Sequence, residues 1–131
     1  MAYMKYKELG KEYNFNQIIP VDKAPSFIRQ YIESDEEIYG IYGTDKEACV
    51  FSSKKLILFD SGFFTESQKV HFFPYKKISS SAIEFKSKTV NIYFSYDSGY
   101  QSDIRFVDFN KDDQANLKKV YLKLISKICE K

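Results

Sequence analysis

Between residues 38 and 106 the chain carries seven apolar or aromatic runs in succession, with no helical pattern between any two of them. The runs cover residues 38–42, 47–52, 55–60, 69–73, 78–86 and 90–96, and a last one that carries Ile104 and Phe106. They are rich in β-branched and aromatic residues and are bounded by turn sequences, including a turn at Ser61 and Gly62. Successive strands joined by short turns pair antiparallel. The sequence therefore predicts seven antiparallel strands.

One amphipathic helix is predicted after the last strand. Its apolar stripe carries Leu117, Val120, Tyr121, Leu124 and Ile128 at helical spacing. Either Asn110 or Asp112 can cap the start of this helix. The helix needs a surface on which to bury its stripe, and the open corner of a strongly bent barrel provides one. We therefore expect an α+β, mainly β fold, a seven-stranded bent antiparallel barrel with a C-terminal capping helix.

Two short helices are predicted before the first strand. Tyr6, Leu9 and Tyr13 lie near helical spacing in residues 2–13, and residues 14–20 are predicted to form a connector. Asp22 can cap a second helix, with Pro25 in its first turn. The apolar face of this second helix carries Phe27, Ile28, Tyr31 and Ile32. We expect residues 1–35 to form a helical extension packed on a domain of residues 36–131, in one structural unit.

Two segments of the strand region resemble a known family. They are Phe51-Ser-Ser-Lys-Lys-Leu-Ile-Leu-Phe-Asp60 and Pro74-Tyr-Lys-Lys-Ile78. They are similar to the bacterial pleckstrin-homology (PH) domain pattern, in which a Phe-Thr-Asn-Lys-Arg-Leu-Ile turn precedes an Ile-Pro-Tyr-x-x-Ile junction. The chain departs from that pattern at Ser52, Ser53, Lys55 and Phe73, and its serines keep the turn chemistry. The resemblance implies a PH-like fold over most of the chain and says little about function.

Composition and charge exclude several classes of protein. Twenty basic and 18 acidic residues give a net charge of +2, and only Arg29 and Arg105 are arginines. Because arginine is the usual reader of phosphates and guanine edges, we expect no nucleic-acid partner. The sequence contains no signal-peptide pattern and no apolar run of membrane-spanning length, which predicts a cytoplasmic protein. Cys49 and Cys129 are expected to be reduced, although sequence alone leaves a disulfide open.

The sequence offers no arrangement of residues typical of catalysis. His71 is the only histidine, so one chain cannot form a histidine triad or a two-histidine metal site. Alternation places His71 opposite Val70 and Phe72, and with these two facing the core it is predicted to face solvent or a partner chain. There is no glycine-rich phosphate loop and no nucleophile elbow. We therefore predict a non-enzymatic protein without cofactor or metal.

The leading functional hypothesis is a binding and assembly module. The family resemblance implies ring-like homo-oligomers, and a strand edge rich in aromatic residues can add a neighbouring copy edge to edge. The predicted contact residues are Phe72, Phe73, Tyr75, Tyr93 and Tyr100. The partner is therefore expected to be a second copy of the chain, with a further, unidentified protein partner.

The alternative is a peripheral module that binds anionic membrane lipid. Lysines outnumber acidic residues between residues 53 and 94. The predicted lipid contacts in the lysine-rich hairpins are Lys54, Lys55, Lys76, Lys77, Lys86 and Lys88. If these lysines lay on one side, each well-placed charge would add about 1 kcal/mol of attraction to an anionic surface. Lysines scattered around hairpin ends would instead serve solubility and edge protection.

Overall fold

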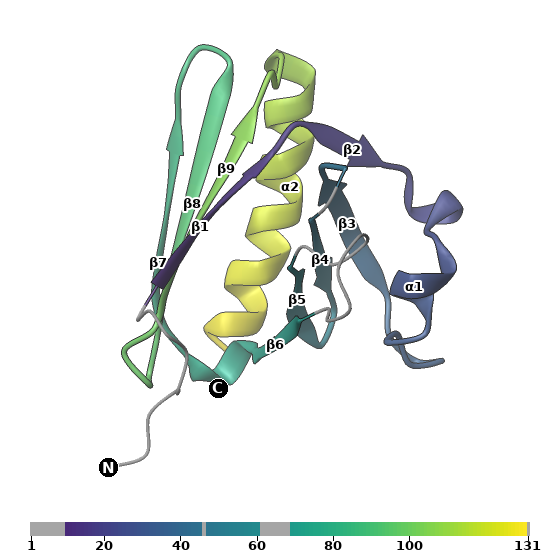
Figure 1. Ribbon diagram of the computed structural model, residues 1–131. Helices are drawn as coiled ribbons and strands as arrows, with labels where there is room; N and C mark the ends of the chain where they lie inside the picture. The colour runs from purple at the N-terminus through teal and green to yellow at the C-terminus, as the bar shows by residue number, and fades with distance from the viewer. Residues whose placement is uncertain (1–9, 46, 61–68, 131) are drawn as a thin grey trace.

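The computed structural model describes residues 10–45, 47–60 and 69–130 of the chain, and in this part nine strands form two sheets beside one long helix (Figure 1). The first sheet has the order β1-β9-β8-β7, with β1 at Gly10–Phe15, β9 at Gln101–Val107, β8 at Thr89–Tyr96 and β7 at Ile78–Phe85. The second has the order β2-β3-β4-β5-β6, with β2 at Gln17–Ile19, β3 at Ile38–Gly43, β4 at Ala48–Ser52, β5 at Lys55–Phe59 and β6 at Val70–Pro74. Helix α2 spans Lys111–Ile128.

The seven predicted strands are all present, as β3 to β9, and neighbours in sequence pair antiparallel within each sheet. The two sheets are bent, with register shifts between Ile38 and Gly40 and between Ile78 and Ser80, but they do not close into a barrel. The chain passes from one sheet to the other between β6 and β7 through a short 3-10 helix, η2 (Tyr75–Lys77). The mainly β, PH-like fold predicted from the sequence is thus confirmed, and the turn predicted at Ser61 and Gly62 lies outside the described residues.

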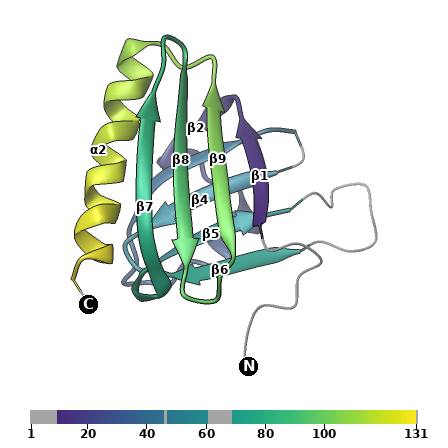
Figure 2. The ribbon, with the colours of Figure 1, turned by 90° about the vertical axis from the view of Figure 1, so that its left-hand side faces the viewer.

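Helix α2 packs against the open side between the two sheets, as Figures 1 and 2 show. Its buried residues are Leu117, Tyr121, Leu124 and Ile128, and Val120 packs partly buried beside them. Asn110 caps the helix, because its side chain accepts a hydrogen bond from the backbone N–H of Asp113, 2.8 Å away, and the Asp113 carboxylate accepts one from the N–H of Asn110. This capping box decides between the two predicted caps in favour of Asn110.

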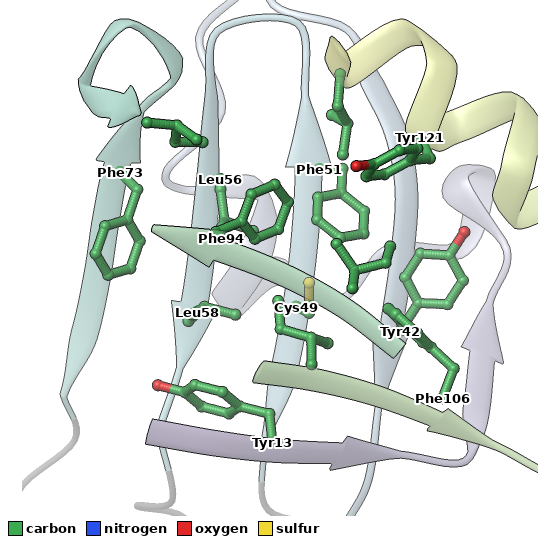
Figure 3. Close-up of a cluster of buried hydrophobic side chains, with 14 of the residues drawn as sticks. Tyr13, Tyr42, Cys49, Phe51, Leu56, Leu58, Phe73, Phe94, Phe106 and Tyr121 are labelled. Carbon is green, nitrogen blue, oxygen red and sulfur yellow. The ribbon is translucent and has the colours of Figure 1, made fainter. Parts of the chain in front are cut away.

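The main core lies between the two sheets and α2. Figure 3 shows Phe51 and Leu56 of the second sheet facing Phe94 of the first, with Tyr121 of α2 at one side. Tyr42 packs edge-on against Phe106, with ring centroids 5.0 Å apart. The two sheets and α2 thus share one continuous core that is rich in aromatic side chains.

The N-terminal segment forms strands where the sequence predicted the first helix. Residues 10–15 form β1, which runs parallel to β9, and only Asn16 separates it from β2, which pairs antiparallel with β3. Tyr13 and Phe15 are buried while Glu12 and Asn14 are exposed, a period of two that is typical of a strand. The predicted helix is therefore wrong for residues 10–13, and its residues 2–9 lie outside the described part of the chain.

The second predicted helix is much shorter than expected. A 3-10 turn, η1 (Val21–Lys23), contains Asp22, and α1 covers only Ser26–Arg29, with Pro25 at its N-cap instead of in its first turn. Arg29 Nε donates a hydrogen bond to the carbonyl of Ala24, 2.7 Å away, which folds the segment back on itself. The predicted apolar face nevertheless packs on the outer face of the second sheet, where the ring of Phe27 meets that of Phe59 edge-on at 5.4 Å.

Candidate functional site

Strand β6 lies at an edge of the five-stranded sheet, near the predicted partner contact. Strand β5 pairs with one side of β6, and no strand in the described part of the chain pairs with the other. An unpaired edge presents backbone N–H and C=O groups that can accept a further strand. Phe72, at the middle of β6, has 45% of its surface exposed. The open edge and the exposed aromatic ring together make β6 a candidate interaction surface.

His71 was predicted to face solvent or a partner chain, but the structure places its side chain in the protein interior. Its side chain is 3% exposed and stacks on Phe73, with ring centroids 6.1 Å apart, and its Nε2 lies 3.4 Å from Asp60 Oδ2. His71 and Phe73 lie opposite Leu58 and Leu56, which belong to the main core. Phe72 and Val70 point to the other side of the sheet, where α1 packs. Because both faces of this sheet cover apolar clusters, alternation alone could not show which face His71 shares.

A groove opens beside β6, where the edge strand and η2 meet the turn between β8 and β9. Its volume is about 340 Å³, and it is lined by Phe72, Phe73, Pro74, Lys77, Tyr96, Asp97 and Ser98. On its aromatic wall, the ring of Phe73 stacks on that of Tyr96 at a centroid distance of 4.4 Å. The backbone N–H of Asp97 donates to the carbonyl of Lys77 at 2.9 Å and holds the two sides together. The groove therefore has an apolar wall and two charged lining residues, Lys77 and Asp97.

The sequence identified only part of this groove. Tyr96, Asp97 and Ser98 were predicted as the end of a strand and a hairpin turn, because nothing in the local sequence places that turn beside η2. The turn residues Asp97-Ser-Gly99 were the one available signal that this end of the hairpin is exposed. The groove is a product of tertiary packing between segments distant in sequence.

The five predicted contact aromatics do not form one surface. Tyr75 and Tyr100 are buried in the core, so their side chains are not available to a partner on the folded chain, which corrects their predicted placement. Phe73 is also buried, at 3% exposure, and reaches the surface only at the wall of the groove. Tyr93 is exposed, but it lies on β8, an interior strand of the first sheet, and its hydroxyl donates to Glu84 Oε1 at 3.2 Å. Phe72 is thus the predicted residue that combines exposure with a position on a sheet edge.

Tyr75 has a structural role in the turn between β4 and β5. Its hydroxyl lies within hydrogen-bond distance of the carbonyl oxygens of Ser52 and Lys55, at 2.7 and 2.9 Å. Ser52 Oγ accepts hydrogen bonds from the backbone N–H groups of Lys54 and Lys55, each at 3.1 Å. Burial raises the pKa of Tyr75, so its hydroxyl keeps its proton and remains a donor. The Ser-Ser-Lys-Lys and Pro-Tyr segments that carry the family resemblance therefore fix a turn and do not form an exposed site.

A buried carboxylate completes this turn. Glu36 accepts hydrogen bonds from the hydroxyl of Ser52, from the backbone N–H of Glu33 at 3.0 Å and from Lys55 Nζ at 2.9 Å. Burial by itself would raise the pKa of Glu36, but these hydrogen bonds and the charge of Lys55 outweigh it, so the pKa lies below its ordinary value. Glu36 is therefore charged at neutral pH and bound within the protein.

The six predicted lipid-contact lysines do not lie together. Lys54 and Lys55 pair with acidic residues, the first with Asp35 at 2.8 Å and the second with Glu36. Lys76 and Lys77 precede β7 while Lys86 and Lys88 follow it, and Figure 2 shows β7 running between the two ends of the first sheet. Eight strand residues span about 26 Å. The six lysines are therefore spread over the turn between β4 and β5 and the two ends of β7, and they do not form one cluster.

The described residues contain no cluster of three metal-ligating side chains and no helix long and apolar enough to cross a membrane. Cys49 is buried and Cys129 exposed, and neither forms a disulfide with any described residue. Burial raises the pKa of the Cys49 thiol well above its ordinary value, so this sulfur is a poor nucleophile.

Comparison with known families and structures places these features in context. The sequence model of the bacterial PH domain family matches residues 9–128 of this chain. No curated protein shows a significant match. The matched range includes β1 to β9 and α2, so it covers both sheets and the groove.

Solved structures of bacterial proteins share this fold. A PH-domain-containing protein from Exiguobacterium sibiricum has a TM-score of 0.63 at 21% identity, over 85% of this chain and 60% of its own length. A DUF1696 family protein with a pleckstrin-homology domain from Shewanella loihica has a TM-score of 0.63 at 19% identity, over 88% of this chain and 98% of its own. A pleckstrin homology domain from Shewanella amazonensis has a TM-score of 0.53 at 19% identity, over 81% and 99%. At these identities the likeness shows the fold, and the chain spans 60% of the Exiguobacterium protein.

Proposed function

Because this chain belongs to the bacterial PH domain family, we propose that it is a non-enzymatic binding module that assembles with copies of itself through the edge of β6. The observation that carries the proposal is Phe72, which is 45% exposed on an unpaired sheet edge, beside a groove of about 340 Å³. An edge of this kind is a template for a strand from another chain. Burial of Phe72 against a second copy would remove apolar surface from water.

The geometry of the edge sets the kind of assembly. If β6 pairs with a different edge of a second copy, the contact is heterologous, and repetition of it closes into a ring or extends as a filament. A stable interface buries about 1,000 Å² or more, which exceeds what one phenylalanine provides. The groove and the segment around α1, where Tyr31 meets Phe72 edge-on at 5.4 Å, are the surfaces that would contribute the remainder.

The experiment is a native mass measurement by light scattering across a concentration range and at two salt concentrations. We expect a mass that is a multiple of 15.4 kDa and that changes little with salt, because the contact is mainly apolar. Phe72→Asp should reduce the mass to that of the monomer, since a carboxylate would have to be buried in the interface.

Leu122→Asp is the matched control, because Leu122 is an apolar residue that is 56% exposed and lies on α2, which belongs to neither sheet. It should leave the native mass unchanged. A monomer at every concentration for the unmodified chain would rule out self-assembly. Equal effects of the two substitutions would rule out the β6 edge as the specific contact.

A further inference from the structure

The outer face of the first sheet contains a polar pocket that the assembly proposal does not use. The pocket has a volume of about 130 Å³ and is lined by Glu12, Tyr13, Asn14, Asn91, Asp103 and Arg105. Its lining comes from β1, β9 and β8, three adjacent strands of one sheet. Since these strands are fixed by continuous ladders, the pocket is held on a rigid support.

Asn91 is the first indication that this pocket is built for a ligand. It lies on the outer face of the sheet, yet it is only 7% exposed. Its Nδ2 donates a hydrogen bond to Asp103 Oδ1 at 3.2 Å, and this carboxylate partner fixes the orientation of the amide. Asn91 Oδ1 is buried and has no hydrogen-bond partner among the described residues. A buried acceptor without a partner is unfavourable, and a bound N–H donor would satisfy it.

The strand register supplies a second, independent indication. Glu12 lies directly opposite Asp103 in the β1–β9 ladder, and like charges in this position repel each other. In the described part of the chain neither carboxylate takes part in an ion pair within 4.0 Å. Arg105 lies two residues after Asp103 on β9. It pairs with Asn14 of β1 on one side and with Asn91 of β8 on the other. A cation between Glu12 and Asp103 would offset their repulsion.

From these features we infer that the pocket binds a primary ammonium or guanidinium group. The cation lies between the carboxylates of Glu12 and Asp103 and donates a hydrogen bond to Asn91 Oδ1. A cationic donor would both satisfy Asn91 Oδ1 and offset the repulsion between Glu12 and Asp103, whereas a neutral donor would only satisfy Asn91 Oδ1. Two carboxylates and one guanidinium leave the pocket with a single net negative charge, so binding is weak, in the millimolar range.

The volume limits the ligand to the head group of a larger molecule or to a small amine. The same chemistry is offered by a free alkylamine and by the lysine or arginine side chain of a protein. The inference does not depend on self-assembly through β6, because the pocket lies on the other sheet. Phe72→Asp should therefore leave it intact.

The test is an NMR titration of the full chain with n-butylguanidine, n-butylamine and the peptide acetyl-Gly-Arg-Gly-amide, following the backbone amide signals of residues 12, 91 and 103 in every variant and, where Asn91 is present, its side-chain amide signals. We expect saturable shifts with all three probes. The neutral n-butylurea, which has N–H donors but no charge, should give none. A peptide that binds more tightly than n-butylguanidine identifies a protein side chain as the source, and equal binding identifies the free cation.

Two substitutions separate a ligand site from a merely structural arrangement. Glu12→Gln should weaken the binding of n-butylguanidine about fivefold, while Glu37→Gln, at an exposed carboxylate elsewhere, leaves it unchanged. Asn91→Val should abolish binding while the melting temperature stays the same or rises, since it removes the unsatisfied acceptor. Absent shifts, equal shifts with n-butylurea, or unchanged binding by Asn91→Val would each overturn the inference.

Discussion

Glu36 is a fully buried side chain whose charge is compensated inside the protein by Ser52 and Lys55. We expect Glu36→Gln to lower the free energy of unfolding by about 2 kcal/mol near neutral pH, because it keeps the shape of the side chain but removes the nearer counter-charge of Lys55 and leaves, among the described residues, only Glu33, 4.0 Å away. Urea denaturation measures this difference. Glu37→Gln, next to it in sequence but exposed, should change the free energy of unfolding by less than about 0.5 kcal/mol. Equal effects of the two substitutions would contradict the assigned role of Glu36.

The shifted pKa of Glu36 implies that its contribution to the free energy of unfolding depends on pH. The pKa of Glu36 in the folded chain lies below its ordinary value of 4.5, so the folded state binds its proton less readily than the unfolded state. The stabilisation by Glu36 is then complete above the ordinary pKa and is lost as the pH falls through the folded pKa. The difference between the unmodified chain and Glu36→Gln should therefore shrink below about pH 4. A difference that stays constant across this range would show that the charge of Glu36 does not stabilise the fold.

Residue orientation was the part of the site that sequence predicted least well. In β6, Val70, Phe72 and Phe73 are all apolar, so the position of the single polar residue, His71, suggested the wrong face. The second sheet is covered on both sides, by the main core and by α1, and such strands lack a clean alternation. The exposure of Phe72 and the burial of Phe73 follow from the pairing of β6 with β5, which the local sequence does not encode.

At the scale of elements, the capping box of α2 gives a direct test of a local interaction. Asn110→Ala should lower the free energy of unfolding by about 1 kcal/mol, because the backbone N–H of Asp113 loses its acceptor. Asp112→Ala, in the same turn but without a cap hydrogen bond, should cost about 0.5 kcal/mol through the helix dipole alone. Urea titrations of both variants measure the difference. A larger loss for Asp112→Ala would mean that the helix begins later than Lys111.

Elements with local signals were predicted, and elements defined by distant partners were not. The hairpin strands and α2 have turn residues, caps and periodic apolar positions within their own sequence. In β1 the burial of residues 12–15 is described, and of these Tyr13 and Phe15 face inward, while the partner strand β9 lies about 90 residues further along the chain. A parallel strand that adds to a sheet through such a distant contact leaves little trace in its own sequence.

At the scale of the whole molecule, the family motif predicted the architecture because its residues form hydrogen bonds that stabilise a turn of the fold. Ser52 and Tyr75 hold the turn between β4 and β5, next to the crossover into the first sheet. The groove beside β6 and the pocket around Asn91 are assembled from segments far apart in the chain, and none of that geometry is a property of the motif. Residues that build a fold and residues that serve a function can thus be separate.

The N-terminal segment connects the two sheets and gives the last prediction. β1 belongs to the first sheet and β2 to the second, with Asn16 between them, and Phe15 is fully buried in the shared core. If the segment is part of the domain, Phe15→Ala should lower the free energy of unfolding of the whole molecule by about 3–5 kcal/mol in one transition. Ile18→Ala, on exposed β2, should cost less than about 1 kcal/mol.

Hydrogen exchange distinguishes this integrated segment from an appended one. The backbone amides of β1 that bond to β9 should exchange with the same free energy as those of β8, because separating β1 from β9 exposes Tyr13 and Phe15 and opens the core. Exchange in β1 that is much faster than in β8, with a small effect of Phe15→Ala, would instead support the division at residue 35 into an extension and a domain. The comparison therefore decides whether the two sheets unfold as one cooperative unit tied together by residues 10–19.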